Sequence, residues 1–183
     1  MMLTIRSPMI FIETDRLILR NYQSEDFSDY YEYMCLPYTA QEEDFEPFTL
    51  QQCREAVNER LTDDSFIAAE LKENHKMIGD LCFRCQEYET FEIAYDFNVA
   101  YENKGFASEA GKALVDYLFS VLNARRITAC CNDTNLKSAR LLERLGFRLE
   151  GHFLEDASFK KDAAGRPVYI SSFYYALLRR EWL

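Results

Sequence analysis

Residues 91–110 read FEIAYDFNVAYENKGFASEA, and this stretch decides the fold. Its apolar first part, which ends at Val99, has the character of a β-strand, and a polar turn from Lys104 to Ala107 then opens a long amphipathic helix. The first turn of a helix has free backbone N–H groups and the positive end of the helix dipole, so a turn with Gly105 at this place is suited to hold phosphate. An ordinary strand-to-helix turn is the alternative, because neither the GxGxxG nor the GxxxxGK[ST] pattern of nucleotide sites is present.

A second informative stretch, residues 132–147, reads NDTNLKSARLLERLGF. Asn135 falls at a predicted helix start and Ser138 lies about one turn later, so their side chains share a face that can point at a ligand. Asn is also a common N-cap residue, and this simpler role for Asn135 stays open.

Charge and hydropathy restrict the kinds of partner. Lys and Arg total 21 and Asp and Glu total 31, which gives a formal net charge of −10 and argues against nucleic acid as a partner. The same charge favours a cationic substrate, such as an amine or a basic peptide end, although solubility explains it equally well. No apolar run approaches the roughly 20 residues of a membrane helix, and the N-terminus lacks signal-peptide features. We therefore expect a cytoplasmic protein with no membrane partner.

Six cysteines are present, and Cys82 and Cys85 form a CxxC pair. This pair lies in a predicted strand, where positions three apart point to opposite faces, and no second CxxC accompanies it. With only two histidines in the chain, we expect reduced thiols and no bound metal.

Periodicity and turn residues predict one mixed-sheet α/β domain over residues 1–183. Apolar patterns predict a strand-like run at the end of 11–20 and strands at 66–71, 77–84, 91–99, 126–131, 147–153 and 168–178. Two helices are predicted in the first half of the chain: one at 24–34 with Ser24 as N-cap, and one that starts at Thr49 and has Cys53, Val57 and Leu61 on one face. A third is predicted at 106–122, where apolar residues repeat at helical spacing: Ala107, Ala110, Leu114, Leu118 and Val121. A fourth is predicted at 135–145, with Gly146 as a left-handed cap. Residues 37–47 and 160–167 are predicted to be loops.

Five motifs, in order along nearly the whole chain, carry a family resemblance. They are TDRLILR at 14–20, EIAY at 92–95, KGFASEA at 104–110, NLKSARLLERLGF at 135–147 and EW at 181–182. The chain resembles the GNAT superfamily of acyl-CoA N-acyltransferases, and within it the RimJ/RimL branch, known for ribosomal-protein N-terminal acetyltransferases. The resemblance implies a splayed central sheet flanked by helices, with acetyl-CoA as cosubstrate.

The resemblance also implies cofactor contacts. Backbone N–H groups of one turn would hold the pyrophosphate; the turn comprises Glu102, Asn103, Lys104, Gly105, Phe106 and Ala107. The backbone of Tyr95, Phe97 and Asn98 would bind the pantetheine arm, with an N–H near Phe97 polarising the thioester carbonyl, and Asn135 would contact the same arm. The family usually has Gln or Arg where this chain has Glu102, and often Gly where it has Asn103, so the Glu102 carboxylate is expected to point away from phosphate.

Acetyl transfer to an amine requires removal of a proton from the amine and protonation of the departing thiolate. By resemblance, Glu92 is the candidate base acting through water, and an ion-paired or solvent-facing strand Glu is the alternative. Many GNAT enzymes use a Tyr as acid where this chain has Leu142, so Ser138 becomes the candidate acid or proton relay. Much of the rate can come from positioning alone.

Three functional hypotheses follow. The first is an N-acetyltransferase acting on a protein or peptide N-terminal amine, by analogy with the branch. The second is an acetyltransferase for a small amine such as an aminoglycoside, polyamine or amino acid, and the third is a non-catalytic acyl-CoA-binding module. The acidic run QEEDFE at 41–46 either lines an acceptor site or is a solvated loop, and the protein is expected to be a monomer or homodimer.

Overall fold

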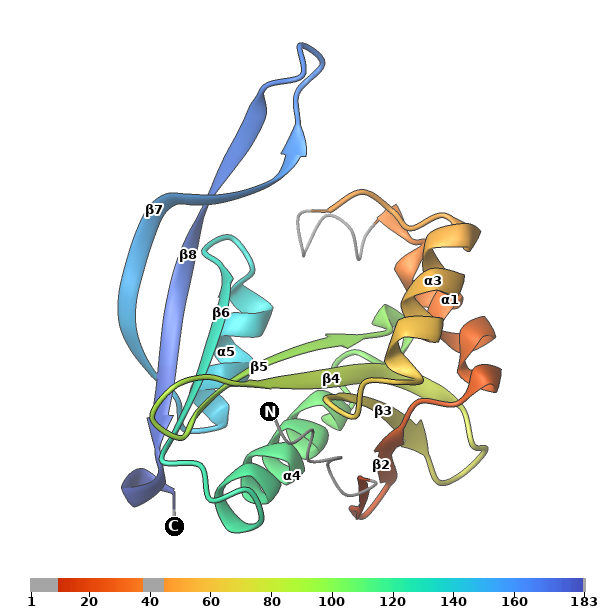
Figure 1. Ribbon diagram of the computed structural model, residues 1–183, viewed down its shortest axis with the longest axis vertical. Helices are drawn as coiled ribbons and strands as arrows, with labels where there is room; N and C mark the ends of the chain where they lie inside the picture. Colours follow the sequence, from red (N-terminus) through yellow and green to blue (C-terminus); the bar gives the residue numbers. More distant parts are fainter. Residues whose placement is uncertain (1–9, 38–44, 183) are drawn as a thin grey trace, which may run out of the picture.

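A computed structural model describes residues 10–37 and 45–182, which form a mixed eight-stranded sheet with helices on both faces (Figure 1). The strand order is β1-β2-β3-β4-β5-β6-β8-β7. The strands are β1 (Phe11–Glu13), β2 (Leu17–Asn21), β3 (Phe66–Leu71), β4 (Met77–Cys85), β5 (Thr90–Phe97), β6 (Arg126–Asn132), β7 (Arg148–Lys161) and β8 (Pro167–Leu178). The α-helices in the described residues are α1 (Phe27–Met34), α3 (Leu50–Arg60), α4 (Phe106–Ser120) and α5 (Leu136–Arg144).

The sheet separates two hydrophobic cores because successive strand residues point to opposite faces. On β3, Ile67 and Ala69 pack in the core that contains the buried residues of α4 and α5. Ala68, between them, packs instead with Tyr30, Val57 and other residues of α1 and α3. Helices α4 and α5 therefore cover one face, and α1 and α3 cover the other (Figure 1).

The sheet splays open in its centre. Strands β5 and β6 run parallel and pair only over Thr90–Glu92 with Arg126–Thr128. Beyond this short contact β5 continues beside β4 as far as Phe97, whereas β6 continues beside β8 as far as Asn132. Two neighbouring strands with different partners must diverge, so a wedge opens between the end of β5 and the start of α5. The splayed mixed sheet expected from the sequence is confirmed.

The strongest local predictions are confirmed. Thr49 caps α3, since its side chain accepts from Gln52 N, and Gly146 ends α5 with a left-handed φ of 86°. Leu114 of α4 is fully buried, as the periodicity predicted. Val121 is 55% exposed, because α4 ends one residue earlier.

Several boundaries were predicted wrongly. Gln23 rather than Ser24 caps the short 3-10 helix that precedes α1. The strand-like end of 11–20 is β2, as predicted, but the same segment also contains β1, which pairs with β2 in the antiparallel direction. Leu61 is 41% exposed at the end of α3. Strand β5 stops at Phe97, and Val99 starts the 3-10 helix η2 (Val99–Tyr101).

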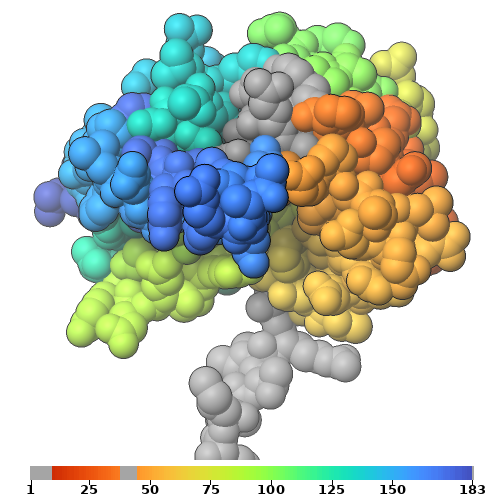
Figure 2. All heavy atoms as spheres, turned by 90° about the horizontal axis from the view of Figure 1, so that it is seen from above, coloured from red at the N-terminus to blue at the C-terminus, as the bar shows by residue number. Residues whose placement is uncertain are grey.

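The C-terminal hairpin is also longer than predicted, since β7 extends to Lys161. In Figure 1 the hairpin of β7 and β8 rises beyond the rest of the sheet. Viewed from above in Figure 2, it reaches across the molecule toward α1 and α3, which are orange. Most of the acidic run at 41–46 lies outside the described residues. No helix in the described ranges is long and apolar enough to cross a bilayer.

Candidate functional site

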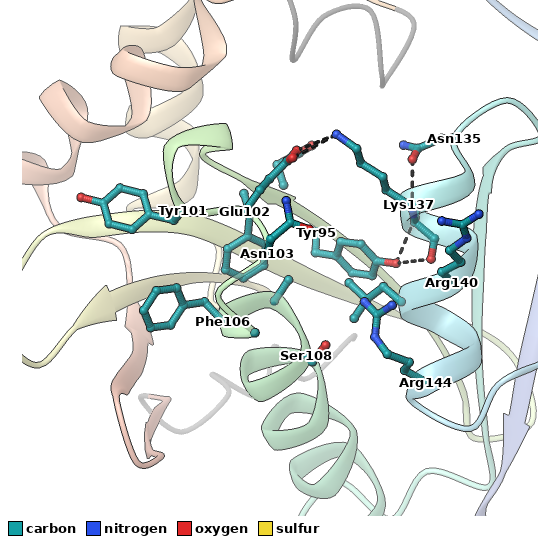
Figure 3. A pocket seen from close by; sticks show the side chains of 16 residues that line it. Tyr95, Tyr101, Glu102, Asn103, Phe106, Ser108, Asn135, Lys137, Arg140 and Arg144 are labelled. Carbon is teal, nitrogen blue, oxygen red and sulfur yellow. Dashed lines mark hydrogen bonds and ion pairs between the residues drawn. The ribbon is translucent and has the colours of Figure 1, made fainter.

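The wedge between β5 and α5 contains a cavity of about 290 Å³ that the start of α4 closes at one end (Figure 3). Close packing of α4 on α5 sets its width, because a Cβ added at Gly111 would lie 2.8 Å from Leu145 Cδ1. The lining comes from β5, the turn before α4, and α5. It comprises Tyr95, Asp96, Phe97, Tyr101, Glu102, Asn103, Gly105, Phe106, Ala107, Ser108, Asn135, Lys137, Ser138, Arg140, Leu141 and Arg144.

The turn before α4 has the backbone geometry of an anion site. Gly105 is the N-cap with φ of 83°, a left-handed conformation that costs little only for glycine. The preceding Asn103 is also left-handed, with φ of 59°. Because the first N–H groups of a helix have no partner within it, the donors of Phe106 and Ala107 are available at the cavity wall.

An ion pair joins the two sides of the cavity mouth. Lys137 Nζ lies 3.0 Å from Glu102 Oε2, and Figure 3 shows the two side chains meeting. Burial raises the pKa of the Glu102 carboxyl, and the neighbouring ammonium acts in the opposite direction. Glu102 therefore lines the cavity with its charge matched by Lys137. The expectation that its carboxylate points away from a bound phosphate stays a prediction.

Helix α5 also places Arg140 and Arg144 at the cavity, and the sequence analysis did not identify either residue. Lys137, Arg140 and Arg144 are spaced by three and four residues, which puts them on one helix face. This spacing is visible in the sequence and could have identified a cationic face on the helix. In a chain with net charge −10, three cations around one cavity favour an anionic ligand there.

A chain of hydrogen bonds connects α5 to β5 across the wedge. Asn135 is buried and is the N-cap of α5, and its Oδ1 accepts from Ser138 N at 3.0 Å. Ser138 Oγ in turn lies 3.0 Å from the Tyr95 hydroxyl, which also donates to the Ser138 carbonyl at 3.3 Å. Asn135 thus has the capping role that was left open, and it lines the cavity as well. The two hydroxyl groups form a connected pair inside the cavity.

Comparison with known proteins decides the family. The acetyltransferase (GNAT) domain pattern matches residues 16–148. The chain belongs to the GNAT acetyltransferase family. The N-acetyltransferase YnaD of Bacillus subtilis is 32% identical over 93% of this chain and 98% of its own length. The N-acetyltransferase p20 of Bacillus licheniformis is 34% identical over 92% of this chain and 96% of its own length.

A solved GNAT acetyltransferase from Bacillus anthracis has the same fold. It is 31% identical, with a TM-score of 0.83 over 94% of this chain and 100% of its own. The GNAT assignment confirms the resemblance and the α/β fold class expected from the sequence. The protein is an acetyl-CoA-dependent N-acetyltransferase, and the family implies an amine acceptor.

Not all of the predicted GNAT site residues line the cavity. Asn98 is buried, and its N–H donates to Ile78 O at 2.9 Å while its side chain caps η2. Lys104 turns its ammonium to the Ala100 carbonyl at 3.1 Å. The other eight predicted cofactor residues do line it: Tyr95, Phe97, Glu102, Asn103, Gly105, Phe106, Ala107 and Asn135. Their individual roles stay predictions.

Glu92 lies outside the cavity lining, on β5 next to Ile93. Ile93 packs in the core shared with α4 and α5, so alternation directs Glu92 to the opposite face, where α1 and α3 lie. Its carboxylate accepts from Gln86 Nε2 at 3.0 Å. Glu92 and Tyr95 are therefore on opposite sides of one strand, at the level where the sheet opens.

Proposed function

We propose that this protein transfers the acetyl group of acetyl-CoA to the N-terminal amine of a protein or peptide. The observation that carries the proposal is the cavity in the splayed sheet, where a left-handed glycine turn at a helix N-terminus faces the cations of α5. A turn of free N–H groups and three nearby cations fit a long ligand that carries phosphates.

The cavity suggests how the cofactor is held. The N–H groups of Gly105, Phe106 and Ala107 would bind the pyrophosphate, and Tyr95 and Ser138, which also line the cavity, would be near the thioester end of the cofactor. Lys137 balances the charge of Glu102, so the unusual acid at this position does not face the phosphates alone. Tyr101 and Phe106, whose rings lie 6.3 Å apart, provide apolar surface beside the turn.

The base and the acid of the reaction lie on opposite faces of β5. The amine approaches from the face of α1 and α3, where Glu92 receives its proton through a water molecule. The nitrogen forms a bond to the acetyl carbon as the bond from carbon to sulfur breaks. The thiolate that leaves takes a proton from the Tyr95 and Ser138 hydroxyl pair on the other face.

The acceptor class rests on the RimJ/RimL resemblance and on the C-terminal hairpin. Phe153 and Tyr174, whose rings are 4.6 Å apart, present an exposed aromatic pair on this hairpin to a polypeptide. Solved relatives named for both acceptor types share the fold at low identity. A ribosomal-protein-S5-alanine acetyltransferase from Vibrio fischeri has a TM-score of 0.73 at 19% identity, and a spermidine N-acetyltransferase from Vibrio cholerae has 0.76 at 21%.

A mass-spectrometric screen tests the proposal. Purified protein and acetyl-CoA are incubated with a library of peptides that have free N-termini, and in parallel with polyamines, aminoglycosides and amino acids. A gain of one acetyl group on peptide N-termini supports the proposal, and N-terminally blocked peptides are the control. Products only among small amines contradict the acceptor class. Acetyl-CoA binding without turnover on any acceptor supports a non-catalytic module instead.

A further inference from the structure

Arg16, in the turn between β1 and β2, contacts the start of α4 although 88 residues separate it from Lys104. Its Nη1 donates to the Lys104 carbonyl at 2.9 Å, and its guanidinium lies 4.2 Å from the centre of the Phe106 ring. A Cβ added at Gly105 would lie 3.4 Å from Arg16 Nη2. One side chain thus contacts Lys104 and Phe106, the residues on either side of Gly105, in the turn that borders the cavity.

Glu109, in the first turn of α4, holds Arg16 in place. Its Oε2 accepts from Arg16 Nε at 2.7 Å and lies 2.7 Å from Nη2, while its Oε1 accepts from Arg16 N at 2.8 Å. Thr14 Oγ1 also donates to Oε1, at 2.6 Å. Burial acts to raise the pKa of the Glu109 carboxyl, but these hydrogen bonds outweigh it and the pKa is lowered. Glu109 is therefore an anion that carries a full set of partners.

The bond to Lys104 fixes the direction of the next N–H group. In a trans peptide unit the C=O and the following N–H point in opposite directions. With the Lys104 carbonyl directed at Arg16, the N–H of Gly105 points away from Arg16. Because Gly105 lines the cavity, this orientation makes its N–H group available to a ligand there.

Arg16 also cancels a charge that works against an anionic ligand. The positive end of a helix attracts anions, and a carboxylate in the first turn competes for that attraction. Glu109 occupies this turn, and the guanidinium at 2.7 Å neutralises it.

We propose that Arg16 is a positioning residue for the cofactor, which keeps the turn in its phosphate-binding form and offsets the charge of Glu109. This inference rests on the proposed placement of the cofactor at the same turn. Removal of Arg16 weakens acetyl-CoA binding and raises its KM, and it leaves kcat at saturating acetyl-CoA close to wild type because the reacting atoms are at the other end of the cofactor.

The test compares Arg16→Met with Arg148→Met. Arg148 is a matched control, since it also pairs with carboxylates and its side chain is 42% exposed against 46% for Arg16, but it lies at the start of β7 outside the cavity lining. Calorimetry with acetyl-CoA is run well below each melting temperature. Loss of a charged hydrogen bond predicts that Arg16→Met raises Kd about tenfold. Arg148→Met keeps the wild-type Kd.

Further variants separate positioning from mere stability. Glu109→Gln in the Arg16→Met background removes the uncompensated charge and recovers part of the affinity, whereas a purely structural role predicts a further loss. Arg16→Lys keeps the positive charge but lacks the planar guanidinium that bonds to both Glu109 and the Lys104 carbonyl, so its Kd for acetyl-CoA lies between those of wild type and Arg16→Met. This Kd can be measured even if Arg16→Met does not fold. An unchanged Kd in both Arg16 variants, or a lower kcat with an unchanged KM, overturns the inference while the proposed function stands. Wild-type protein that binds no acetyl-CoA overturns both.

Discussion

Gly105→Ala tests whether the left-handed turn binds the cofactor. Gly105 has φ of 83°, and an L-residue in this region costs about 1–2 kcal/mol. The added methyl group contributes little, because its nearest atom, Arg16 Nη2, lies 3.4 Å away, which is ordinary van der Waals contact. Gly105 is exposed, so the free variant can relax the turn locally and must restore it when the cofactor binds.

The free energy needed to restore the left-handed turn appears as a weaker affinity for acetyl-CoA. About 1–2 kcal/mol corresponds to a rise in the Kd for acetyl-CoA of roughly 5- to 30-fold at 25 °C. Isothermal titration calorimetry measures this value directly, and thermal unfolding measures whatever part of the cost the folded state retains. For a domain of this size, each kcal/mol lowers the melting temperature by about 2–4 °C.

Gly165→Ala is the matched control. Gly165 has φ of 78°, and a Cβ there meets nothing within 4 Å, so its backbone cost is comparable. It lies in the turn between β7 and β8, outside the cavity lining. This variant is expected to lose stability at most and to keep the wild-type Kd. Equal Kd values for Gly105→Ala and wild type refute the assignment of this turn to the cofactor.

Three further predictions concern chemistry and stability. Glu92→Gln lowers kcat by about a hundredfold at pH 7 with little change in the Kd for acetyl-CoA, and full activity would remove Glu92 as the base. Ser138→Ala keeps the hydrogen bond from the backbone N–H of residue 138 to Asn135 Oδ1, and it also lowers kcat without changing the Kd for acetyl-CoA. An unchanged steady-state rate contradicts the role of the Ser138 hydroxyl in protonating the thiolate. Glu70→Gln leaves the buried Arg20 short of a partner and costs about 3 kcal/mol at pH 7 by denaturant unfolding. The pKa of Glu70 is lowered from 4.5, so its stabilisation is present above pH 4.5 and is lost as the pH falls below it; a variant with a constant deficit at every pH contradicts this.

Local signals in the sequence predicted the parts of the fold that local forces determine. Thr49 and Gly146 mark helix ends because a side-chain cap and a left-handed glycine act within a few residues. Helix α4 could be predicted for the same reason, because its buried apolar residues recur at helical spacing within one segment of the chain.

The features that were not predicted depend on contacts across the chain. The turn between β1 and β2 has local hydrogen bonds between Thr14 and Leu17, but Glu109 also joins it to α4, and no local pattern in 11–20 shows that contact. The pairing of Lys137 with Glu102 depends on how α5 meets the turn before α4. Both residues were visible in the sequence, but their proximity follows only from the splay of the sheet.

A calorimetric titration of the wild-type protein with acetyl-CoA, run beside CoA and ATP, tests whether the cavity binds the cofactor. We expect saturable binding of acetyl-CoA and CoA at one site per chain, and much weaker binding of ATP, which lacks the pantetheine arm that we propose enters the wedge. Absence of heat with acetyl-CoA and CoA, or equal affinity for ATP, would contradict the placement of the cofactor between β5 and α5.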